Sequence, residues 1–159
     1  MKTIIVGLGN PILGDDGVGW KVIENISQNL RADASVGIEC LSLGGLGLME
    51  RLIGYDRAIV VDSFIAEKEE IGSILTRNLN DLPNYSAFHI TSAHDTSLQN
   101  AIELGRRMGA YLPNEIIVIG VAIRTIREFS EELSPPVAEA VQKAARMALG
   151  LLKQPVINL

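Results

Sequence analysis

The strongest constraint on the fold is a regular alternation of short apolar runs with segments of helical periodicity. The apolar runs cover residues 2–6, 36–43, 57–64, 72–77 and 116–123, and the run at 72–77 is predicted to lie at a sheet edge. The helical segments cover residues 17–30, 46–53, 95–108 and 134–153. This alternation predicts βαβ units and a three-layer α/β/α sandwich around a mostly parallel, twisted sheet.

Composition predicts one domain that spans residues 1–159. The chain is 47% hydrophobic and carries a formal net charge of −5, with Lys and Arg scattered along it. Because nucleic-acid binders usually show a basic stripe, we expect no nucleic-acid partner. The N-terminus lacks the features of a signal peptide, and no apolar run approaches the roughly 18 residues that span a bilayer. A cytoplasmic protein without a membrane partner is therefore expected.

The single cysteine, Cys40, cannot form an intramolecular disulfide bond. It lies in the apolar run 36–43, so we interpret it as a small buried hydrophobic residue and not as a nucleophile.

Two adjacent carboxylates, Asp15 and Asp16, follow the glycine-rich turn after the first predicted strand, and Asp62 is expected to close the Val60-Val61 strand. Each acid has an ordinary explanation, since one of the pair can cap the first helix and Asp62 can bond a turn amide. Carboxyl ends of parallel strands, however, meet at one edge of the sheet, where ligands bind. The acids are therefore predicted to converge there.

Nucleotide binding fits this turn poorly. The glycines Gly7, Gly9 and Gly14 do not keep the G-x-G-x-x-G spacing, no acid follows the second strand, and no Walker sequence occurs. Two carboxylates at a helix start would also repel a pyrophosphate. A divalent cation would instead relieve their repulsion, and an imidazole from His89 or His94 would complete a ligand set suited to zinc, nickel or a similar ion.

The sequence resembles the hydrogenase maturation endopeptidases, which trim the C-terminal extension of the [NiFe]-hydrogenase large-subunit precursor. The motifs that carry the likeness are Gly7-Leu8-Gly9-Asn10, Gly14-Asp15-Asp16-Gly17-Val18-Gly19, Val60-Val61-Asp62, Ser92-Ala93-His94, Ile119-Gly120-Val121 and Leu133-Ser134-Pro135. The resemblance spans nearly the whole chain and implies the phosphorylase/hydrolase-like form of the α/β/α sandwich.

The resemblance also implies the site. Asp16, Asp62 and His94 become the metal ligands and the catalytic residues, which leaves Asp15 as the expected helix cap. Asn10, Gly44 and Gly45 become substrate-binding residues. Nickel is then supplied by the precursor, which is the expected partner of a monomeric enzyme; zinc or cadmium could occupy the same ligands.

One position departs from the family pattern, and two residues of the first motif carry specific expectations. Leu43 precedes Gly44 and Gly45 where the family commonly has Asp, which affects the expected substrate subtype. Gly9 is expected to need close backbone packing or a positive φ. Asn10 is expected to order the metal loop or to bond the substrate backbone, and the alternative is that it merely closes a turn before Pro11.

Two alternative functions remain open. Peptidyl-tRNA hydrolases share Val-Gly-Leu-Gly-Asn-Pro, found here at residues 6–11, but they need a histidine soon after it, where this chain has Asp15-Asp16-Gly17. A nonenzymatic nickel carrier is the other alternative, and the missing acid at Leu43 is the feature that favours it.

Overall fold

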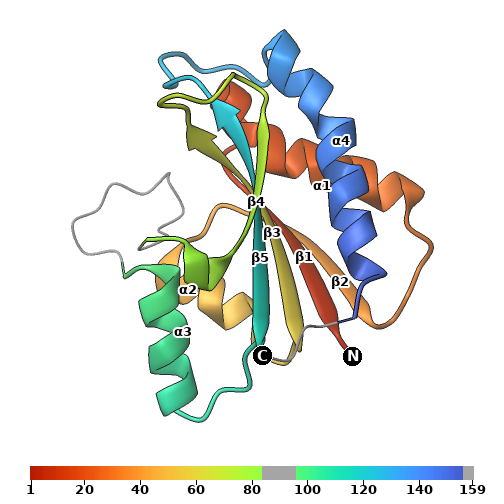
Figure 1. Cartoon of the computed structure of the whole chain (residues 1–159), viewed down its shortest axis with the longest axis vertical. Coiled ribbons are helices and arrows are strands. Elements are labelled where there is room, and N and C mark those ends of the chain that lie inside the picture. The colour runs from red at the N-terminus through yellow and green to blue at the C-terminus, as the bar shows by residue number, and fades with distance from the viewer. Residues whose placement is uncertain (84–95, 156–159) are drawn as a thin grey trace.

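A five-stranded sheet forms the middle layer of the protein (Figure 1). The computed structural model describes residues 1–83 and 96–155. The strands are β1 (Thr3–Leu8), β2 (Val36–Leu41), β3 (Arg57–Ile65), β4 (Ile74–Asn78) and β5 (Glu115–Ile123). Their order is β2-β1-β3-β5-β4, with β4 antiparallel to β5 at one edge and all other pairs parallel. The predicted parallel sheet and its edge strand are both confirmed.

Helices cover both faces of the sheet. They are α1 (Val18–Asn29), α2 (Gly45–Arg51), α3 (Leu98–Arg107) and α4 (Pro135–Leu152), with 3₁₀ turns η1 (Gly14–Gly17) and η2 (Leu79–Asp81). In Figure 1, α1 and α4 lie to the right of the sheet and α2 and α3 to the left, so the three-layer α/β/α prediction is confirmed. Within the described residues, no helix combines the length and apolar character needed to cross a membrane.

Side-chain alternation along the strands builds two cores, one on each face of the sheet. Ile4, Val6 and Leu8 of β1 belong to the core under α2 and α3. Ile5 belongs to the core under α1 and α4. Because successive strand residues point to opposite faces, a central strand that is covered on both sides must be apolar throughout. This explains why β1 and β5 are continuously buried.

The start of α1 lies directly against the backbone of β1 and β3. A Cβ atom built on Gly19 would overlap the Leu8 carbonyl oxygen and would lie 2.6 Å from the Val61 carbonyl oxygen. Only glycine allows this approach, because the atoms that a side chain would meet are main-chain atoms that cannot rotate away. The residues just before α1, which include Asp16, are thereby held close to the sheet.

Asp15 does not cap α1, which corrects the prediction from the sequence. Gly17 occupies the N-cap position of α1, and no side chain bonds the helix start there. Asp15 instead accepts hydrogen bonds from the Ser134 backbone N–H (2.6 Å) and the Ser134 hydroxyl (2.7 Å). Ser134 is the N-cap residue of α4, as expected. Its hydroxyl donates to Asp15, however, and makes no capping bond within α4. Asp15 therefore ties η1 to the start of α4.

Replacing Gly19 by alanine tests the close approach of α1. We expect Gly19→Ala to lower the free energy of unfolding by about 1–3 kcal/mol, because the added methyl group overpacks against two carbonyl groups. The matched control is Gly150→Ala in α4, where an added Cβ meets nothing within 4 Å. In that control variant the free energy of unfolding should rise by up to about 1 kcal/mol, because alanine favours a helix more than glycine does. Urea unfolding measures both values, and equal stability of the two variants would contradict the packing argument.

Candidate active site

Asp16 is completely buried beneath the loop that follows β1. Its side chain is 0% exposed. One carboxylate oxygen accepts a hydrogen bond from the Asn10 backbone N–H (2.8 Å), and the other accepts one from the Ser63 hydroxyl (3.0 Å). The loop can close over Asp16 because Gly9 has a φ of 137° and no Cβ atom, which would overlap the Asp16 carbonyl oxygen. The expectation that Gly9 needs close backbone packing or a positive φ is confirmed, and both are present.

Asp62 lies inside β3 and not at its end, which corrects the prediction from the sequence. The strand continues to Ile65 because β3 and β5 stay paired from Asp62↔Gly120 to Ile65↔Ile123. Asp62 is 1% exposed, and its carboxylate accepts a hydrogen bond from the Ser63 backbone N–H (2.8 Å). It alternates with the apolar core residues Ala58 and Val60, and so it points to the face of the sheet that α2 and α3 cover.

Ser63 joins the two buried acids. Its hydroxyl donates to Asp16, and its backbone N–H donates to Asp62. No sequence motif marks Ser63 as a site residue, although it directly follows Asp62. The predicted convergence of Asp16 and Asp62 is supported by this shared neighbour, since one residue contacts both carboxylates.

Two deeply buried carboxylates that both accept a hydrogen bond from Ser63 make an environment that favours a cation. Burial removes the water that would otherwise stabilise each negative charge. Carboxylate oxygens are hard donors, and a divalent ion held by them would offset this loss. Within residues 1–83 and 96–155, no group of three His, Cys, Asp or Glu side chains forms a complete metal site.

The third predicted ligand, His94, lies outside the described residues, as does His89. Its role therefore remains a prediction. The chain is described again from Thr96, whose carbonyl oxygen would be 2.6 Å from a Cβ atom on Gly45. The segment that follows His94 thus approaches the start of α2.

Gly44 and Gly45 lie between β2 and α2. Gly44 is the N-cap residue of α2, and its carbonyl oxygen accepts a hydrogen bond from Leu48 N–H (3.3 Å). Gly45 has a φ of 49° and passes close to Thr96. These contacts explain why glycine is needed at position 45, while substrate binding by the pair stays a prediction.

Asn10 closes the turn before Pro11. Its side-chain oxygen accepts a hydrogen bond from Ile12 N–H (3.2 Å), and its carbonyl oxygen accepts one from Leu13 N–H (3.1 Å). Its own backbone N–H holds Asp16. The turn-closing role is therefore present, and the same turn orders the loop that carries Asp16. Contact of Asn10 with substrate stays a prediction.

Cys40 has the properties of a structural residue. It lies in β2 opposite Gly7 and is half-buried. Burial raises the pKa of its thiol, and the nearby Glu24 carboxylate raises it further. A thiol with a raised pKa forms little thiolate at neutral pH, which agrees with the prediction that Cys40 is not a nucleophile.

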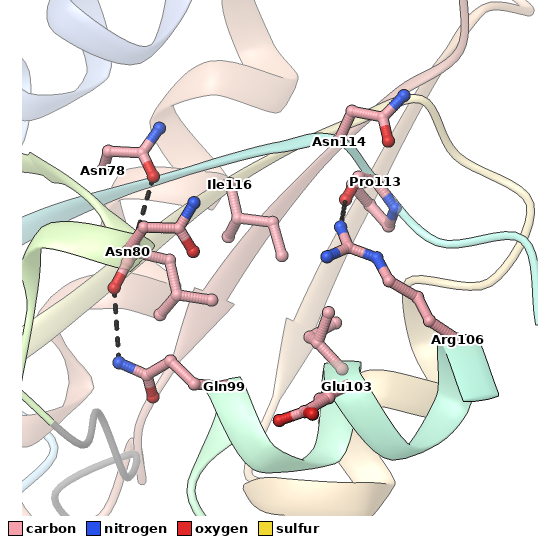
Figure 2. A pocket seen from close by; sticks show the side chains of 10 residues that line it. Asn78, Asn80, Gln99, Glu103, Arg106, Pro113, Asn114 and Ile116 are labelled. Carbon is pink, nitrogen blue, oxygen red and sulfur yellow. Dashed lines mark hydrogen bonds between the residues drawn. The ribbon is translucent and has the colours of Figure 1, made fainter. Parts of the chain in front are cut away.

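A hollow of about 310 Å³ lies between η2 and α3 (Figure 2). The polar side chains that line it form hydrogen bonds with main-chain groups close by. Asn78 accepts a bond from Asn80 N–H (3.1 Å), Gln99 donates to the carbonyl groups of Leu79 and Leu82, and Arg106 donates to Pro113 O (2.6 Å). Asn78 pairs with Ile117, toward the beginning of β5, whereas Asp62 pairs with Gly120 farther along that strand. This hollow therefore belongs to the scaffold around α3.

Comparison with known proteins identifies the family. Residues 20–151 match the family model described as hydrogenase maturation protease. A Methanocaldococcus jannaschii protein provisionally named as a hydrogenase maturation protease is 31% identical over 95% of this chain and 96% of its own length. The hydrogenase expression/formation protein HoxM of Azotobacter vinelandii is 26% identical over 96% of this chain and 73% of its own length.

The same architecture occurs in a solved structure. The hydrogenase maturating endopeptidase HybD from Escherichia coli superposes with a TM-score of 0.79 at 22% identity, covering 96% of this chain and 93% of its own. This likeness shows the fold, whereas the family follows from the sequence matches. By these sequence matches the chain belongs to the hydrogenase maturation protease family and is an endopeptidase.

Proposed function

We propose that this endopeptidase removes the C-terminal extension of a nickel-loaded [NiFe]-hydrogenase large-subunit precursor. The family supports the class of substrate. The observation that carries the site assignment is the burial of Asp16 and Asp62 on either side of Ser63. The enzyme is proposed to act as a cytoplasmic monomer that engages its substrate transiently.

The donor set fits nickel that belongs to the substrate. Asp16, Asp62 and His94 supply two carboxylates and one imidazole, which would leave coordination positions for the cysteines of the precursor. Zinc or cadmium would suit the same donors. The protein ligands would then hold the substrate by its own nickel and need no resident metal.

The chain's own groups supply positioning and a proton acceptor. Asn10 N–H and the Ser63 hydroxyl each donate a hydrogen bond to one oxygen of Asp16 and fix the orientation of its carboxylate. A carboxylate held this way can accept the proton of the attacking water. The substrate's nickel can polarise the scissile carbonyl group or lower the pKa of that water.

The other proposed contacts surround this centre. Asn10, Gly44 and Gly45 are proposed to meet the substrate backbone. Leu43 is exposed and directly precedes these glycines. An apolar side chain there would suit a substrate segment without a positive charge, which accounts for the departure from the family's acid as a difference in substrate subtype.

Metal titration tests the choice of histidine. We expect calorimetry with nickel or cadmium to show one site on the parent protein, and we expect His94→Ala to weaken it by at least about tenfold through loss of an imidazole ligand. His89→Ala is the matched control and should bind as the parent does. The opposite order of the two variants would show that His89 is the ligand.

Precursor processing tests the proposed function itself. Purified precursor is prepared with and without nickel, and release of the C-terminal peptide is followed by mass spectrometry. We expect cleavage of the loaded form only, because contact with the substrate's nickel exists only there. Equal cleavage of both forms would indicate a conventional metalloprotease. Cleavage of neither form, with a competent precursor, would favour the carrier alternative.

A further inference from the structure

An exposed aromatic side chain marks the segment between β5 and α4, residues 124–134, which we name the Phe129 loop. Phe129 is 81% exposed, the highest value among the large hydrophobic side chains of the described residues. Covering such a side chain with a partner makes the free energy of binding more favourable, and aromatic side chains are frequent anchors of protein interfaces.

Hydrogen bonds hold this exposed position in place. Ser130 N–H donates to Ile12 O (2.9 Å), and Gly14 N–H donates to Ser130 O (2.6 Å). Leu13 and Ser130 thereby form a parallel bridge. Ile12 and Phe129 directly precede the two bridged residues, so their backbones lie side by side. Ile12 is also exposed, at 47%.

The bridge connects the Phe129 loop to the candidate active site. Residues 12–14 lead directly into η1, which carries Asp16. A shallow hollow of about 410 Å³ lies between the loop and this turn, lined by Gly14 and Asp15 on one side and by Arg124 and Arg127 on the other. A protein that brings its tail to Asp16 would therefore lie beside the Phe129 loop.

The hollow has a defined charge pattern. Arg124 and Arg127 are exposed, and neither pairs with an acid among the described residues. Its acidic groups are Glu128, Glu132 and Asp15, the last of which is already bonded to Ser134. Both guanidinium groups are thus available, and they suit carboxylates on a partner because a guanidinium group can bond both oxygens of a carboxylate.

We propose that Ile12, Arg124, Arg127 and Phe129 form a docking surface for the hydrogenase precursor. Phe129 and Ile12 are the apolar anchor, and the two arginines bind carboxylates of the precursor. This assignment rests on the proposed function, and continuity of the surface with the Asp16 turn is the reason for choosing the precursor as its occupant. Aromatic and arginine residues dominate the binding energy of many protein interfaces, which fits a protein substrate.

Steady-state processing of nickel-loaded precursor tests this surface. We expect Phe129→Ala to raise KM by at least about tenfold, with kcat within about twofold of the parent, because the residue contributes to docking and not to chemistry. Met108→Ala, which removes another large exposed side chain (78%) at the end of α3, is the matched control and should change neither value. Thermal unfolding should be the same for all three proteins.

Salt dependence tests the arginines separately. In the Arg124→Gln/Arg127→Gln double variant, KM should be higher at low salt and should change less with ionic strength than in the parent, because screening weakens exposed charge pairs. Calorimetry with metal-free precursor, which is expected to remain uncleaved, gives the same comparison through Kd.

The outcomes separate this assignment from the proposed function. A parent protein that neither binds nor cleaves the precursor contradicts both. A parent that cleaves it, with unchanged KM and Kd in Phe129→Ala and in the arginine variant, contradicts the docking surface alone. If Phe129→Ala instead converts a dimer to a monomer in sedimentation with KM unchanged, the surface serves a second copy of the chain, and the docking assignment is wrong.

Discussion

The hydrogen bonds that Ser63 makes to two buried carboxylates are the interaction on which the site depends. They connect Asp16, from the turn before α1, with Asp62, from the interior of β3. Neither acid could be placed at such depth without bonded partners, because burial of a bare carboxylate is costly. The fold thus accepts an electrostatic cost at this point, which is typical of a functional site.

Backbone packing makes that connection possible. Gly19 lets the start of α1 rest on the sheet, and Gly9 lets the loop after β1 close over Asp16. Asp15 adds a tie to Ser134 at the start of α4, and the Leu13–Ser130 bridge adds a second tie to the segment after β5. These packing contacts and hydrogen bonds fix the turn that carries Asp16, so its position is set before any substrate binds. Such preorganisation lowers the cost of arranging a catalytic group during the reaction.

Local patterns predicted most of the fold, because the period of apolar residues follows from which face of a strand or helix is buried. The strands were placed to within two residues at their ends, and the edge position of β4 was anticipated, although its antiparallel direction was not. Local patterns failed where distant residues decide the outcome. Asp62 was expected at a strand end, but pairing with β5 extends β3 to Ile65. Asp15 was expected to cap α1, but its partner is Ser134, which is 119 positions away in the sequence. Ser63 was missed because an isolated serine carries no signal until the fold places it between two acids.

The family likeness reduced the functional alternatives that the residues alone had left open. The peptidyl-tRNA hydrolase and carrier alternatives shared one turn or one missing acid with this chain, whereas the maturation proteases match it over residues 20–151. Asp16 and Asp62 could be tied to each other only through the structure. Their metal-binding role and that of His94 remain proposals about chemistry that the fold makes possible.

A double-mutant cycle on the two acids tests the central claim that they act as one unit. Asp16→Asn, Asp62→Asn and the double variant are compared with the parent by kcat/KM for nickel-loaded precursor, with circular dichroism as the check on folding. If the acids form one centre, each single variant should lose at least about a hundredfold, and the double variant should lose little more than either single one. Losses that multiply in the double variant would show two independent contributions. A folded Asp16→Asn variant with parental kcat/KM would contradict the assignment of this centre.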